Sequence, residues 1–104
     1  MDEIRDKKII TLADLRAMRD QIIELAERNG ATNVRVFGSV ARGDMTETSD
    51  VDLLVDVGEG TSIFDMVGLW QDLRDLLGRE VSLIGDSHRD TRFRRRIEKD
   101  LVPL

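Results

Sequence analysis

Residues 38–55 read GSVARGDMTETSDVDLLV and are the most informative stretch of this 104-residue chain. From Asp50 to Val57, polar and apolar side chains alternate with a period of two, which predicts a β-strand. Residues 33–37 read as another short strand, which Gly38-Ser39 ends. Residues 39–42 leave room for one helical turn between the two strands. The stretch therefore predicts a strand, one helical turn, a polar turn-like segment at residues 44–49 and a second strand.

The second predicted strand has two unlike faces, because successive strand residues point to opposite sides of a sheet. One face is apolar and comprises Val51, Leu53, Val55 and Val57. The other begins with Asp50 and Asp52, about 7 Å apart by strand rise. Carboxylates this close repel each other, and carboxylate oxygens are ligands that Mg²⁺ prefers. We predict that both aspartates bind metal and act in catalysis, whereas Asp56, about 13 Å beyond Asp52, is a solvated acid.

The Gly38-Ser39 pair forms the other side of the predicted site. Glycine lets a phosphate approach the backbone closely, and the first amides of a helix bind anions. Ser39 adds a hydroxyl, and Arg42, one turn later, can reach the same anion with its guanidinium group. A surface ion pair between Arg42 and Asp44 is the alternative. The predicted pocket thus binds phosphates on one side and their metal on the other.

Three longer segments have the apolar spacing of helices. Residues 12–29 and 63–77 each follow a capping box and precede a glycine, and a last helix is expected at residues 89–101. Residues 80–84 read as a third strand, and residues 1–10 as a frayed start. The order predicts a single α/β domain over residues 1–104. Its small mixed sheet has three to four strands, with helices packed against one face.

Composition disfavours several classes of protein. Sixteen basic and 21 acidic side chains give a net charge of −5, so we expect no general binding to nucleic acids or anionic membranes. With no cysteine and one histidine, His88, the chain has no disulfide framework, no thiolate nucleophile and no His-rich metal site. No stretch resembles a signal peptide or a membrane span, and we expect a cytoplasmic protein.

Gly38-Ser39, ten further residues and Asp50-Val51-Asp52 resemble the Gly-Ser-x10-Asp-x-Asp signature of the polymerase-β-like nucleotidyltransferase superfamily. The full stretch 38–55 is similar to the minimal nucleotidyltransferases, the MntA-like antitoxins encoded beside HEPN-domain toxins. Residues 62–69 and the Arg-rich tail that ends in Val102-Pro103-Leu104 also look like this family, so the likeness covers residues 33–104. The two parts of the signature are weak separately, and their spacing makes the match specific.

The resemblance implies a polymerase-β-like core and an activity. The two aspartates would bind Mg²⁺, Gly38 and Ser39 would hold the triphosphate of ATP, and Arg42 would assist. Ser49, immediately before the acidic pair, is a further nucleotide-binding candidate. The reaction would transfer AMP from ATP to a hydroxyl and release pyrophosphate. In the antitoxin branch the acceptor is a tyrosine of the cognate HEPN ribonuclease, which adenylylation silences.

One position departs from the family's pattern. The family usually has a third carboxylate in the next strand, where this chain has Ser82. A hydroxyl is a weaker Mg²⁺ ligand than a carboxylate and is no general base near neutral pH. Glu80 lies on the same strand face but is displaced by about 6.6 Å. The alternative to an active enzyme is therefore a catalytically weakened or inactive homologue that neutralises its toxin by binding alone.

Residues 92–96 read Arg-Phe-Arg-Arg-Arg. Their arginines fit the solvent-exposed face of an amphipathic helix or, as the alternative, a patch that binds RNA or an acidic partner. Trp70 and Phe64 are expected to pack in the core. A nucleotidyltransferase that modifies a small molecule such as an aminoglycoside is a third functional hypothesis, disfavoured because no second domain is expected to bind the acceptor.

Overall fold

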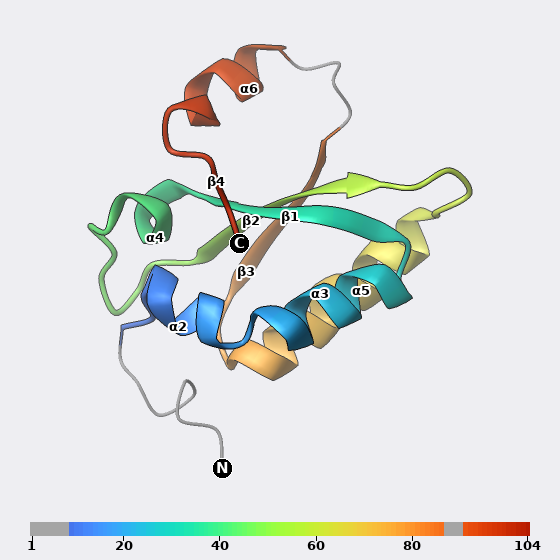
Figure 1. The fold of residues 1–104 in the computed structure, drawn as a ribbon, viewed down its shortest axis with the longest axis horizontal. Coiled ribbons are helices and arrows are strands. Elements are labelled where there is room, and N and C mark those ends of the chain that lie inside the picture. The colour runs from blue at the N-terminus through green and yellow to red at the C-terminus, as the bar shows by residue number, and fades with distance from the viewer. Residues whose placement is uncertain (1–8, 87–90) are drawn as a thin grey trace.

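The computed structural model describes residues 9–86 and 91–104 and shows one sheet with helices on both faces (Figure 1). The helices are α2 (Leu12–Ala17), α3 (Arg19–Arg28), α4 (Gly38–Arg42), α5 (Ile63–Leu77) and α6 (Thr91–Glu98). The strands are β1 (Ala31–Phe37), β2 (Val51–Val57), β3 (Val81–Asp86) and β4 (Val102–Pro103). The predicted α/β class with a small mixed sheet is confirmed.

The strand order in the sheet is β3-β2-β1-β4. Strands β1 and β2 are antiparallel, β2 and β3 are parallel, and β4 runs antiparallel to β1. The register places Phe37 opposite Asp52 and, on the other side, Asp52 beside Ser82. The sheet thus brings the end of β1 and the beginnings of β2 and β3 to one edge.

The main core fills the space between the sheet and the helices α2, α3 and α5. Leu53 and Val55 of β2 pack there against the helical residues Leu69 and Leu73. Ile10 also belongs to this core and is only 1% exposed, so the predicted frayed start does not extend to that residue. Burial of such side chains is the main force that holds the helices on the sheet.

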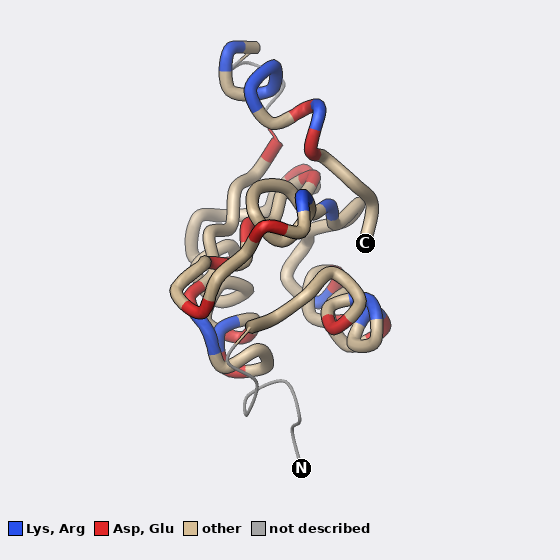
Figure 2. The backbone as a smooth tube through the Cα atoms, turned by 90° about the vertical axis from the view of Figure 1, so that its left-hand side faces the viewer, with Lys and Arg blue, Asp and Glu red and all other residues tan. Residues whose placement is uncertain are grey.

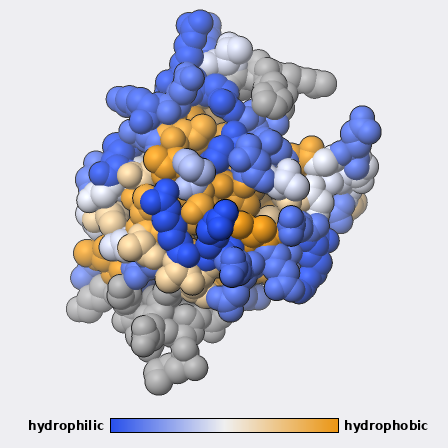
Figure 3. Space-filling view, viewed as in Figure 1, coloured by the Kyte–Doolittle hydropathy of each residue, from blue (hydrophilic) through white to orange (hydrophobic). Residues whose placement is uncertain are grey.

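A second, smaller core lies on the opposite face of the sheet. Phe37 and Leu54 are buried there with Ile97 of α6, and the rings of Phe37 and Phe93 meet edge to face at 5.8 Å between centroids. The expectation that helices cover one face alone is therefore wrong for α6, which Figure 1 shows across the sheet from α3 and α5. In Figure 3, apolar residues gather between α6 and the α2–α3 segment, with hydrophilic residues around them.

Several element boundaries differ from the predicted ones. The helix expected over residues 12–29 divides at Met18, whose backbone leaves the helical conformation. The helix expected at residues 89–101 ends at Glu98, and residues 89–90 lie outside the described part, as does His88. Phe64, expected in the core, is 82% exposed on α5. Within the described residues, no helix combines the length and apolar character that a membrane crossing needs.

Candidate functional site

The turn after β1 lies directly against the beginning of β2. Because Phe37 is the register partner of Asp52, the next residue, Gly38, sits beside the Asp52 carboxylate. The backbone of Gly38 is left-handed, with φ +73°, and a Cβ built on it would lie 2.1 Å from Oδ2 of Asp52. Only glycine fits both this conformation and this close approach. The two halves of the predicted site therefore adjoin each other.

The two predicted catalytic acids have no side-chain partner among the described residues. Asp52 is half-buried and Asp50 is exposed, and neither carboxylate makes a hydrogen bond or ion pair within that part of the chain. Burial raises the pKa of the Asp52 carboxyl, and the nearby charge of Asp50 raises it further, whereas Arg42 acts in the opposite direction. The pair is thus a partly desolvated negative site that a cation would stabilise.

Helix α4 presents polar groups toward the same region. Its N-cap, Phe37, supplies no side-chain hydrogen bond, so the first backbone amides of α4 are not capped by that side chain. The hydroxyl of Ser39 is likewise without a hydrogen-bond partner in residues 9–86 and 91–104. Val40 is buried and anchors the helix, while Gly43 ends it in the left-handed conformation. These donors are available to an anion.

Arg42 is held by two acids at the rim of the site. Its Nε donates to Oδ2 of Asp44 at 3.1 Å, and its Nη1 donates to Oδ2 of Asp100 at 3.0 Å. The hydrogen bond to Asp44 and then that to Asp100 raise the pKa of the guanidinium. The ion pair with Asp44 was the alternative from the sequence, and it is confirmed. Asp100 was missed, because 58 residues separate it from Arg42 and no local pattern links them.

Ser49 has a structural contact of its own. Its Oγ accepts a hydrogen bond from the backbone N–H of Thr46 at 2.8 Å, and its own N–H donates to the carbonyl of Thr46. These bonds close the turn that leads into β2 and so position the acidic pair. A role of Ser49 in nucleotide binding stays a prediction.

Ser82, the residue expected where the family usually has a third carboxylate, lies beside Asp52 in the sheet. Ser82 and Asp52 are register partners in the parallel pair β2–β3. Glu80 does not substitute for the missing acid, because its carboxylate pairs with Nη2 of Arg74 on α5 at 2.7 Å. Across the described ranges, with their gap at 87–90, no group of three His, Asp or Glu side chains is placed to hold a metal. The site has two acids.

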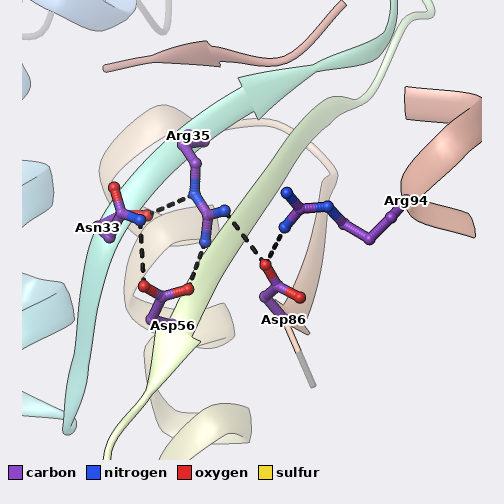
Figure 4. Close-up of polar contacts among 5 residues, drawn as sticks. All are labelled: Asn33, Arg35, Asp56, Asp86 and Arg94. Atoms are coloured by element: carbon purple, nitrogen blue, oxygen red, sulfur yellow. Dashed lines mark hydrogen bonds and ion pairs between the residues drawn. The ribbon is translucent and has the colours of Figure 1, made fainter. Parts of the chain in front are cut away.

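A second polar cluster occupies the far end of the same sheet face (Figure 4). Arg35, whose side chain is only 11% exposed, pairs with Asp56 at 2.6 Å and with Asp86 at 3.2 Å. Asn33 donates to Asp56 at 3.1 Å, and Arg94 of α6 also binds Asp86, whose side chain is 2% exposed. The prediction that Asp56 is a solvated acid is therefore wrong. Because arginines neutralise these acids, the cluster is no competing metal site.

The donor set at Asp50 and Asp52 fits a hard divalent cation. Both side chains offer carboxylate oxygens that no described residue pairs with, and burial together with the charge of Asp50 raises the pKa of Asp52. Gly38 leaves open backbone beside them, where a ligand's phosphate can approach. Two carboxylates together with bound phosphate and water are a common Mg²⁺ environment.

Comparisons with known proteins agree with this geometry. The family model described as polymerase beta, nucleotidyltransferase, matches residues 20–104. A Methanocaldococcus jannaschii protein named as a protein adenylyltransferase is 38% identical over 71 residues, 68% of this chain and 76% of that protein. Protein adenylyltransferase MntA of Thermococcus cleftensis is 38% identical over 79 residues, 76% of this chain and 80% of the relative.

Solved structures show the same fold. One described as a minimal nucleotidyltransferase is 41% identical, has a TM-score of 0.80, and covers 91% of this chain and 97% of its own. A toxin–antitoxin structure with AMP-PNP has a TM-score of 0.69 over 81% of this chain and 69% of that chain, and at 22% identity it bears on the fold alone. With a Gly-Ser turn against an Asp pair and these matches, the chain belongs to the polymerase beta family of nucleotidyltransferases.

Proposed function

We propose that this nucleotidyltransferase binds Mg²⁺–ATP and transfers AMP to a tyrosine hydroxyl of a cognate HEPN ribonuclease, which it thereby silences as an antitoxin. The observation that carries the proposal is the position of Gly38 directly against the Asp52 carboxylate, because it brings the proposed phosphate-binding turn next to a proposed metal ligand. Relatives named protein adenylyltransferase and a toxin–antitoxin neighbour that holds AMP-PNP support it.

Each group of the pocket has a distinct task in this proposal. Asp50 and Asp52 would hold the Mg²⁺, which would supply neutralisation of the phosphate charge and polarisation of the phosphorus that is attacked. The backbone at Gly38 and the hydroxyl of Ser39 bind the triphosphate, and Arg42 stands at the rim to add positive charge. The acceptor oxygen forms a bond to the α-phosphorus, the bond to pyrophosphate breaks, and the acceptor proton leaves to solvent.

Ser82 supports a second candidate function. With a hydroxyl beside Asp52, the pocket has no third carboxylate at that position to accept the proton of the attacking hydroxyl or to ligate metal. A chain with this site can bind nucleotide while transferring AMP slowly. It would then neutralise its toxin by forming a complex rather than by modifying it.

The proposed transfer is tested by co-expression with the toxin and intact-mass analysis of the partner. The wild type should add AMP to the partner, and Asp52→Asn should abolish the addition. Asp56→Asn is the matched control, because Asp56 lies on the same strand and face but binds Arg35 instead of facing Gly38. Isothermal titration of the free protein with Mg²⁺–ATP tests the pocket separately. Absence of nucleotide binding by the folded wild type would refute the site.

Two variants separate transfer from neutralisation by binding. If Asp50→Asn/Asp52→Asn still protects cells from the toxin and the partner carries no AMP, the second candidate is correct. If protection is lost while the complex still forms, transfer is the essential activity. Ser82→Asp restores the missing carboxylate and should raise the rate of transfer where the wild type is a weakened enzyme.

A further inference from the structure

Helix α6 carries a concentrated positive charge on an acidic protein. Residues 91–100 hold five basic and two acidic side chains, whereas the chain as a whole has a net charge of −5. Figure 2 shows this segregation, with Lys and Arg segments gathered on α6 at the top of the molecule. A local field of this kind attracts negatively charged partners even when the whole molecule is acidic.

The arginines of α6 divide into one that anchors the helix and three that face solvent. Arg94 binds the buried carboxylate of Asp86 (Figure 4). The neighbouring Phe93 and Ile97 pack on the sheet. The other three, which are Arg92, Arg95 and Arg96, are exposed and make no ion pair to any residue of the described part of the chain. Apolar packing and one buried ion pair therefore fix the helix, and three positive charges are left for a partner.

Helix α6 lies beside the candidate active site, and its basic face is turned outward from the sheet. Phe93 contacts Phe37, the residue directly before Gly38, and Ile97 packs with Leu54, two residues after Asp52 on the same strand face. Just beyond α6, Asp100 binds Arg42 of α4. A macromolecule bound to α6 would therefore lie next to the proposed nucleotide-binding groups at Gly38 and Arg42.

We propose that the exposed arginines of α6 dock an acidic segment of the protein that accepts the nucleotide, close to its reactive hydroxyl. The proposal rests on the proposed transfer to a protein and specifies what that protein presents. An acidic protein segment fits better than a nucleic acid, because Phe93, the one aromatic side chain of α6, packs on Phe37 and offers no base-stacking platform. The acidic remainder of the chain would also repel a long polyanion.

The test uses Arg92→Gln/Arg95→Gln, which removes two charges from one side of α6 and leaves Arg94 and Phe93 intact. Arg19→Gln/Arg28→Gln is the matched control, because it removes two exposed charges from α3 and gives the same net charge. The probe is a fluorescent peptide with one tyrosine flanked by glutamates, compared with a glutamine-flanked version and with single-stranded RNA of equal length. Anisotropy measures binding, and titration with Mg²⁺–ATP is run in parallel.

The α6 variant should bind the acidic peptide about five- to tenfold more weakly than the wild type, as expected from two exposed charge pairs. The control and Arg92→Lys/Arg95→Lys should bind like the wild type, and added salt should remove the difference. Equal peptide binding by all variants would refute the docking surface, and tighter α6-dependent binding of RNA would refute the choice of partner. If every variant binds Mg²⁺–ATP as the wild type does, a loss of peptide binding reports on the docking surface alone. Failure of the proposed nucleotide site would instead appear as absence of Mg²⁺–ATP binding by the wild type.

Discussion

Replacement of Gly38 by alanine should damage both the stability and the nucleotide site of this protein. Gly38 adopts φ +73°, and the added methyl group would lie 2.1 Å from Oδ2 of Asp52. Gly43, five residues later, offers a matched control, since it has φ +85° and no atom within 4 Å of the place that an added methyl group would take. The pair separates backbone strain, which both variants share, from the collision with Asp52, which only Gly38→Ala has.

The expected losses of unfolding free energy follow from the backbone strain and from the collision with Asp52. A left-handed backbone costs an alanine about 1–2 kcal/mol, and this cost applies to both variants. Turning the Asp52 side chain out of its rotamer well to make room costs about 0.5–1.5 kcal/mol more, in Gly38→Ala alone. Gly43→Ala should therefore lose about 1–2 kcal/mol of unfolding free energy, and Gly38→Ala about 1.5–3.5 kcal/mol. In thermal unfolding, each kcal/mol corresponds to about 4–8 °C for a domain near this size.

Urea unfolding gives the free energies, and titration with Mg²⁺–ATP gives the effect on the site. Because the displaced group is a proposed metal ligand, Gly38→Ala should also weaken Mg²⁺–ATP binding, while the binding of Gly43→Ala changes less. Equal destabilisation by the two substitutions, together with wild-type nucleotide affinity in Gly38→Ala, would refute the claim that the turn and the aspartate share one pocket.

Three more outcomes follow from other parts of the structure. Ser82→Asp should tighten Mg²⁺ binding severalfold, seen by titration with the metal alone, because it adds a carboxylate beside Asp52. The raised pKa of Asp52 makes the metal-free folded state bind a proton more tightly than the unfolded chain, so stability falls as pH rises from about 4 through the folded pKa. Asp52→Asn should therefore melt above the wild type at pH 7 in EDTA, with a smaller difference near pH 3. Leu73→Ala, at a core position 1% exposed, should cost about 2–5 kcal/mol in urea unfolding without a specific effect on Mg²⁺–ATP affinity among molecules still folded.

Local pattern was sufficient to predict the centre of the fold and of the site. The alternation through residues 50–57 predicted β2, and the capping box at Ser62 with Gly78 predicted α5 at its observed bounds. The adjacency of Gly38 and Asp52 was expected from the family's signature, and the antiparallel register of β1 and β2 produces it in the structure. The alternation of β2 and the caps of α5 are local signals, so these two elements are readable from the sequence alone.

The features that the sequence did not predict depend on long-range pairing. Strand β4 has two residues, too few for any alternation to be recognised. The Asp100–Arg42 pair joins segments 58 residues apart, and no local signal marks it. Leu54 did carry a signal for the position of α6. An apolar residue on an otherwise acidic strand face needs a cover, and α6 provides it through Ile97.

The same strand face shows why similar aspartates have different roles. Asp52 and Asp56 both point to the side of β2 that α6 partly covers, but β1 supplies them with different neighbours. Opposite Asp52 the chain places Phe37 and then a glycine, neither of which offers a cation, so β1 gives this carboxylate no ion-pair partner. Burial, and then the charge of Asp50, raise the pKa of Asp52. Near Asp56 it places Arg35, which neutralises the acid and ties the far end of the sheet to α6 through Asp86. Strand β1 therefore determines which of these two acids of β2 an arginine neutralises, and a pattern confined to β2 cannot make that distinction.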